Sequence, residues 1–92
     1  MATTICGEFE WDDAKAEANE RKHGVTFEAA ALAVDDTYAV VFPDGAHIDR
    51  VNVIGMGADR VLFVVATERG HRTRIISARR ATPAERRAYE EG

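Results

Sequence analysis

The sequence predicts one α+β domain, in which an antiparallel sheet of about four to five strands packs against two N-terminal helices and one C-terminal helix. Three observations support this. Apolar side chains near the N-terminus recur at helical spacing, residues 38–80 hold runs of β-branched residues between turn sequences, and residues 82–85 form a helix start. The chain of 92 residues fits one domain, 1–92. The helices must pack on the sheet to bury their apolar faces.

The N-terminal third predicts one strand and two helices. Residues 1–7 carry no pattern and are expected to be loose, whereas residues 9–12 alternate apolar with acidic side chains, which favours a short edge strand. An aspartate then caps a helix that runs to about Lys22, and Gly24 ends it. A second helix follows, because apolar residues of 27–34 recur at helical spacing.

Four strands are expected next, in residues 38–42, 51–56, 60–67 and 72–80. Residues 60–67 are strongly apolar, so this strand should be central and covered on both faces. The turns between the strands are rich in glycine and aspartate, which suits short hairpin connections.

The last helix has the clearest start signal in the chain. Thr82 is expected to be the cap, Pro83 occupies the first helical position, and Glu85 completes a capping box. The helix is expected to run to about Tyr89.

Charge is divided unevenly along the chain, although the net charge is only −4. Residues 1–59 hold four basic residues against twelve carboxylates, whereas residues 60–92 hold eight arginines against four glutamates. Such asymmetry favours a basic face that an anionic partner would meet locally. Arginine suits phosphate because its planar guanidinium donates two parallel hydrogen bonds. The alternative is a solvated charged surface with no ligand.

Several classes of protein are excluded at this stage. The single cysteine, Cys6, allows neither an internal disulfide nor a cysteine-based metal site. No apolar run approaches the ~20 residues that cross a bilayer, and no secretory signal is present, so a soluble cytoplasmic protein is expected. The histidines lack metal-ligand spacing, so no metal or other cofactor is expected.

Residues 72–80 combine an apolar centre, Ile75 and Ile76, with arginines at both ends. Strict strand alternation divides their side chains between two faces. One face would carry Arg72, Arg74, Ile76, Ala78 and Arg80, and the other would carry Thr73, Ile75, Ser77 and Arg79, so a flat strand cannot serve one site with both groups. The alternative is that twist or the turn into the helix relaxes this division at Arg79 and Arg80, near the strand end.

A set of ordered motifs carries a family resemblance. The set comprises Phe9-Glu10-Trp11-Asp12, Lys15, Asn19, Arg21-Lys22-His23-Gly24-Val25, Phe27-Glu28-Ala29-Ala30, Asp35-Asp36, Val41-Phe42, Ile54-Gly55, Thr67-Glu68-Arg69-Gly70, residues 74–82, Glu85-Arg86 and Tyr89-Glu90. In these motifs the chain resembles the BrnT-type ribonuclease toxins of bacterial type II toxin–antitoxin systems, which are small RelE-like domains. The resemblance covers about residues 8–90.

The resemblance implies a metal-independent endoribonuclease that cleaves RNA and arrests growth. It also implies neutralisation by a cognate antitoxin, a BrnA-like ribbon-helix-helix DNA-binding protein whose complex represses its own operon. Operator DNA would then be contacted only through the antitoxin, and no membrane is involved. A dimer or a heterotetramer with the antitoxin is plausible.

Metal-independent RNA cleavage proceeds by in-line attack of the 2′-hydroxyl on the adjacent phosphate. It needs a general base, cations on the phosphate oxygens and a proton donor for the leaving oxygen. The expected general base is Glu68 or His23. The expected catalytic residues are Lys22, His23, Glu68, Arg72, Arg79 and Arg80, and the expected RNA-binding residues are Arg69 and Arg74.

Some of these residues also have a purely structural interpretation. Lys22 and His23 suit the negative end of their helix dipole without any ligand. Glu68 could pair with Arg69 or Arg72 across the hairpin. At the level of function, the alternative is a non-catalytic RNA- or protein-binding module of the same fold, and a third reading is an inactive relative.

Overall fold

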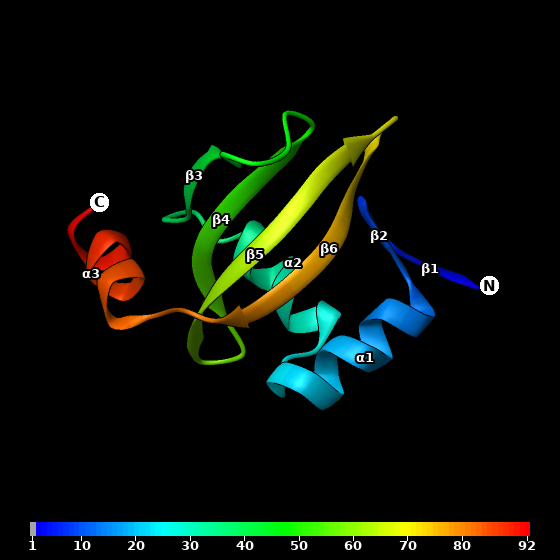
Figure 1. Cartoon of the computed structure of the whole chain (residues 1–92), viewed down its shortest axis with the longest axis horizontal. Helices are drawn as coiled ribbons and strands as arrows, with labels where there is room; N and C mark the ends of the chain where they lie inside the picture. Colours follow the sequence, from blue (N-terminus) through cyan, green and yellow to red (C-terminus); the bar gives the residue numbers. More distant parts are fainter. Residues whose placement is uncertain (1) are drawn as a thin grey trace.

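The computed structural model describes residues 2–92 and confirms the α+β class (Figure 1). Its elements are β1 (Thr3–Cys6), β2 (Phe9–Asp12), α1 (Asp13–His23), α2 (Phe27–Val34), β3 (Val40–Pro43), β4 (Arg50–Gly57), β5 (Arg60–Arg69), β6 (Arg72–Arg80) and α3 (Pro83–Glu91). None of the helices within the described residues is long and apolar enough to cross a membrane.

All strands join one six-stranded sheet in the order β1-β2-β6-β5-β4-β3, rather than the four to five strands expected. The sheet is mixed, because β2 pairs in parallel with β6, with Phe9 opposite Thr73 and Glu10 opposite Arg74. The additional strand is β1, which forms a hairpin with β2 and therefore places β2 inside the sheet instead of at its edge. Most of β1 is exposed, so it carries no apolar pattern.

The helices α1 and α2 cover one face of the sheet, and the core lies between these helices and the sheet (Figure 1). Trp11 of β2 meets Phe27 of α2 edge to face, with ring centroids 6.1 Å apart. The alanines of α2 let its backbone approach β4 closely. A Cβ at Gly55 would lie 2.1 Å from the Ala33 carbonyl oxygen, so only glycine fits there.

The opposite face of the sheet is covered by helix only at one end. Along β5, residues Leu62, Val64 and Ala66 are buried against α1 and α2, whereas the intervening Phe63 and Val65 are only half-buried. The strand is central, as expected, but the expected cover on both faces was wrong. The helix at that end, α3, contacts β4 and β5 and has no buried residue.

A β-bulge interrupts the pairing of β5 with β6. Val65 lies opposite Ser77, but the next residue, Ala66, lies opposite Ile75, so Ile76 is the extra residue. The bulge reverses the alternation of side chains on either side of it. The strict alternation predicted from the sequence was therefore wrong: Arg72 and Arg74 share a face with Arg79, and Arg80 lies on the other face.

Candidate nucleic-acid interface

We call the side of the sheet opposite α1 and α2 the open face. Paired residues of neighbouring strands point to the same side of a sheet, and successive residues of a strand alternate between the two sides. Residues that alternate with the buried core residues, together with their cross-strand partners, therefore belong to the open face. The polar and aromatic residues of the open face include Glu10, Phe42, Arg50, Asn52, Phe63, Thr67, Arg69, Arg72, Arg74, Ser77 and Arg79. An arginine-rich sheet face with aromatic side chains is a general way of binding single-stranded nucleic acid.

Four of these residues form a cross-strand row, one from each of four neighbouring strands. Glu10 lies opposite Arg74, Arg74 opposite Thr67, and Thr67 opposite Arg50. Neighbouring strands are about 4.8 Å apart, so the Cα atoms of Arg50 and Arg74 are roughly 10 Å apart. Two guanidinium groups at this separation can reach one phosphate between them.

The cross-strand row contains a tight ion pair. Arg74 Nη1 lies 2.6 Å from Glu10 Oε2, and the two side chains are only 20% and 13% exposed. The Thr67 hydroxyl donates to the Asp49 carbonyl oxygen at 2.5 Å, which fixes the chain immediately before Arg50. The row therefore holds the Glu10 carboxylate and the Arg74 guanidinium in defined positions, and it fixes the backbone from which the Arg50 side chain extends.

Arg72 extends the basic character of the open face towards the β5–β6 hairpin, where it lies opposite Arg69. The side chain is half-buried, and its Nε atom is buried without a hydrogen-bond partner among the described residues. A buried N–H without a partner costs about 1–3 kcal/mol.

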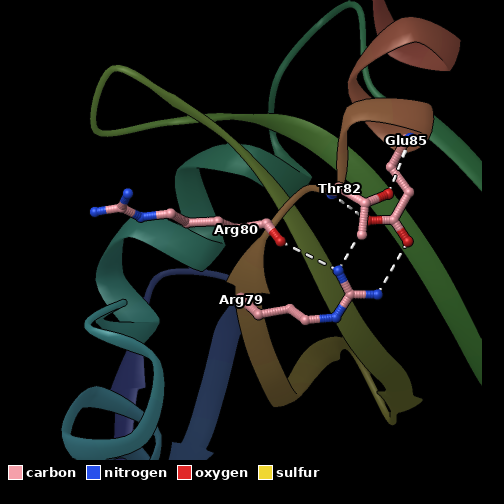
Figure 2. Close-up of polar contacts among 4 residues, drawn as sticks. All are labelled: Arg79, Arg80, Thr82 and Glu85. Carbon is pink, nitrogen blue, oxygen red and sulfur yellow. Dashed lines mark hydrogen bonds and ion pairs between the residues drawn. The ribbon is translucent and has the colours of Figure 1, made fainter.

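Arg79 lies at the other end of the open face and is fully engaged within the protein (Figure 2). Its guanidinium donates two hydrogen bonds to Glu85, at 2.8 and 2.9 Å, and lies 4.2 Å from the centre of the Phe63 ring. The hydrogen bond from Arg79 lowers the pKa of Glu85, and the same bond raises the pKa of Arg79. Arg79 thus anchors α3 to the sheet.

Arg80 points away from Arg79 (Figure 2). It lies opposite Leu62, whose side chain is in the core, so Arg80 is on the side of α1 and α2. Lys22 and His23 are on this side too, about one helical turn beyond Asn19, which hydrogen-bonds to Ala78 of β6. The structure thus groups Arg80 with Lys22 and His23 rather than with Arg79.

Glu68 lies apart from both groups. It is exposed near the β5–β6 hairpin and opposite Thr73, on the side of the sheet away from Arg72. Seven strand positions separate Thr73 from Arg80, which corresponds to about 23 Å. The expected site residues therefore fall into three places: the open face, the end of α1 with Arg80, and the hairpin.

Sequence reasoning predicted only Arg74 of the cross-strand row as a site residue and missed Glu10, Thr67 and Arg50. Glu10 was read only as the polar position of a short strand, because its parallel pairing with Arg74, 64 residues later, leaves no local signal. Arg50 was placed in a loop, whereas it begins β4. A signal for Arg50 was available, since it immediately precedes the apolar run of β4.

We also considered a hollow near the C-terminus and a metal centre as sites within the described residues. A hollow of about 620 Å³ is bordered by Tyr38, Tyr89 and Glu90 and has no cationic side chain in its lining. Within residues 2–92, no group of three or more histidine, cysteine, aspartate or glutamate side chains is placed to hold a metal ion. The open face is thus the better candidate for an anionic ligand.

A comparison with known protein families matches most of the chain. Residues 11–85 match the family described as "Ribonuclease toxin, BrnT, of type II toxin-antitoxin system". The matched segment includes every residue of the cross-strand row except Glu10, which directly precedes it. The comparison with curated proteins gives no match.

Proposed function

This chain belongs to the BrnT family of ribonuclease toxins from type II toxin–antitoxin systems, and on that basis we propose that it cleaves RNA on the open face without a metal ion. The cross-strand row is the observation that carries the proposal. It places a carboxylate in contact with one arginine and a second arginine within reach of the same phosphate. These groups can supply the general base and the phosphate-binding cations of in-line cleavage.

The proposed mechanism assigns a role to each group. Glu10 takes the proton from the attacking 2′-hydroxyl, while Arg74 and Arg50 bind the non-bridging phosphate oxygens. Arg72 lies on the same face next to Arg74 and adds positive charge beside the same phosphate group. The bond from phosphorus to the 5′-oxygen breaks, and that oxygen takes a proton from water, which leaves a 2′,3′-cyclic phosphate and a 5′-hydroxyl.

This assignment replaces Glu68 and His23 as the base. Both were expected from sequence, but neither is on the open face with Arg72, Arg74 and Arg79. Arg79 is assigned a positioning role, because its guanidinium is already occupied by Glu85. It keeps the start of α3 beside the proposed RNA path.

A cognate antitoxin is the partner that membership of this family implies. We propose that it is a BrnA-like ribbon-helix-helix DNA-binding protein that contacts operator DNA and covers the open face with an acidic segment. Released toxin would then cut RNA in the cytoplasm and arrest growth.

One observation favours a non-catalytic RNA-binding module instead. Arg74 and Arg79 are both paired with carboxylates, at 2.6 and 2.8 Å, which reduces the charge that they offer to a phosphate. A binder would tolerate this, whereas a catalyst needs Arg74 to shift towards the substrate. The two functions differ in their product.

The deciding experiment is cleavage of labelled RNA by the purified protein in the presence of EDTA. We expect fragments with 2′,3′-cyclic phosphate ends. Glu10→Gln and Arg50→Gln should each lower kcat by about 10²-fold or more, with folding checked by circular dichroism. Arg87→Gln removes an exposed charge of α3 outside the open face and should cut like the wild type.

Three other outcomes would contradict parts of this proposal. Binding of RNA without cleavage would contradict the proposed catalysis and support the non-catalytic binding module. Cleavage that disappears in EDTA would contradict the metal-independent mechanism. Full activity of Glu10→Gln would exclude Glu10 as the base and return attention to Glu68 and His23.

A further inference from the structure

A second basic site lies at the end of the sheet opposite the β5–β6 hairpin. Here a cleft of about 280 Å³ opens between the β4–β5 turn and the connection from β6 to α3. We call it the end cleft. Its lining residues are Asp59, Arg60, Val61, Arg80, Ala81 and Arg86.

The three arginines of the end cleft come from three different elements, β5, β6 and α3. None of them takes part in an ion pair within residues 2–92, where the pairs involve Arg21, Arg74 and Arg79 instead. The end cleft is therefore bordered by three arginines without carboxylate partners among the described residues, and their positive charge would attract an anion.

The walls of the end cleft are held in place by hydrogen bonds. The Ala81 N–H donates to the Val61 carbonyl oxygen at 3.0 Å, which ties the β6–α3 connection to β5. Arg79 Nη1 donates to the Arg80 carbonyl oxygen at 3.1 Å, and its ion pair with Glu85 fixes the first turn of α3, which carries Arg86 (Figure 2). These bonds thus fix the backbone of the β6–α3 connection, which forms one wall of the end cleft.

Asp59 gives the end cleft a second chemical character. It sits in a tight turn with Ala58, and both residues have positive φ angles, 53° for Ala58 and 65° for Asp59. A carboxylate repels phosphate but accepts a hydrogen bond from a hydroxyl group. A ligand that satisfies both the arginines and Asp59 must carry phosphate and hydroxyl groups close together, as a ribose-phosphate unit does.

We propose that the end cleft binds a ribose-phosphate unit of the RNA substrate outside the segment that is cut. This inference rests on the proposed function in taking RNA as the substrate. Arg80 lies six residues beyond Arg74 on β6, so the end cleft is about 20 Å from the cross-strand row. At the stacked spacing of about 3.4 Å per nucleotide this is roughly six nucleotides, so long RNA reaches both sites and a tetranucleotide reaches one.

The test is RNA binding by Glu10→Gln protein, in which intact RNA can be verified on a gel. The double substitution Arg60→Gln with Arg86→Gln should weaken binding of a 12-nucleotide RNA about tenfold and reduce the salt dependence by about 0.7 in slope for each phosphate that the variant no longer binds. Binding of a tetranucleotide should not change. Arg21→Gln with Arg87→Gln makes the same change in net charge elsewhere and is the matched control.

Asp59 is tested by its effect on the choice of nucleic acid. Asp59→Gly keeps the positive φ angle of the turn but removes the carboxylate, so the preference for the 12-nucleotide RNA over DNA of the same sequence should fall several-fold. An unchanged preference would exclude the contact to the 2′-hydroxyl.

Three results would overturn the end cleft as an RNA site. The first is equal weakening by the control pair, which would indicate general charge. The second is equal weakening of tetranucleotide binding. The third is loss of duplex DNA binding with unchanged RNA binding. Because the measurement is of binding, it stands whether or not the wild type cleaves RNA.

Discussion

Asn19 acts as a substitute for a strand at the edge of β6. Its side-chain amide donates to the carbonyl oxygens of Ala78 and Val25, at 2.8 and 3.0 Å, and accepts from the Ala78 N–H at 3.1 Å. The parallel strand β2 pairs with β6 only at residues 73 and 74, so it does not reach Ala78. One buried side chain therefore satisfies three backbone groups and positions the end of α1 beside β6.

We expect Asn19→Ala to lower the free energy of unfolding by about 2–4 kcal/mol, because it leaves buried backbone groups without partners. Asn19→Asp should cost at least as much, since a carboxylate would face two carbonyl oxygens. Urea denaturation measures both, and Glu20→Ala at the adjacent exposed position is the control. A loss below about 0.5 kcal/mol for Asn19→Ala would show that water replaces the amide.

The helix α3 is attached to the sheet mainly by polar contacts. Glu85 pairs with Arg79, and the Tyr89 hydroxyl donates to Asp36 Oδ2 at 2.5 Å. Asp36 also accepts from the Met56 N–H at 2.8 Å. Since α3 buries no residue, these contacts decide how firmly it is held.

These contacts make the attachment of α3 dependent on pH. The hydrogen bond from Arg79 lowers the pKa of Glu85 below its usual 4.5, and the hydrogen bond from Tyr89 lowers the pKa of Asp36 below its usual 3.8. A lowered pKa contributes stability above the unfolded value, which is lost as the pH falls through the folded value. The hydrogen bond to Asp36 raises the pKa of Tyr89 above its usual 10.0. The stability that this raised pKa contributes is therefore lost only when the pH rises through the folded-state pKa of Tyr89.

We therefore expect amide hydrogen-exchange protection of residues 86–91 to be highest between about pH 5 and 10 and to fall below pH 4. At pH 7, Glu85→Gln and Tyr89→Phe should each reduce this protection several-fold. Protection of residues 17–23 in α1 is the internal reference. Unchanged protection of α3 in both variants would mean that apolar contacts, not these polar ones, hold the helix.

At the scale of the whole molecule, the local parts of the fold were predictable and the distant pairings were not. The capping box of α3 is present, and β6 spans residues 72–80 as predicted, because both depend on neighbouring residues. The parallel pairing of β2 with β6 joins distant segments, and its polar Glu10 has no local signature. The strand β1 was equally hard to predict, because almost none of its side chains is buried and its sequence therefore has no apolar pattern.

The candidate site depended on a feature that is invisible in the sequence. Ile75 and Ile76 are both apolar, so nothing in their pattern shows which one bulges. The bulge nevertheless decides that Arg72 and Arg74 share the open face with Arg79, while Arg80 joins Lys22 and His23 on the other side. Residue types at the site were predictable, and their grouping was not.

The open face also makes a prediction for the complex with the antitoxin. The N-terminal half of the chain is acidic and the open face is basic, so an acidic antitoxin segment is attracted to the open face and repelled elsewhere. It would compete with RNA for Arg50, Arg69 and Arg72, none of which has an ion-pair partner within residues 2–92.

Modification by phenylglyoxal, which reacts with accessible arginines, measures this competition by mass spectrometry. In the free toxin we expect Arg50 and Arg69 to react readily, and in the complex their reaction should slow about tenfold or more. Arg21 on α1 is largely exposed beside Glu17 and should react equally in both states. Equal reaction of Arg50 and Arg69 in both states, with Arg60 and Arg86 protected instead, would place the antitoxin over the end cleft and leave the open face free in the complex.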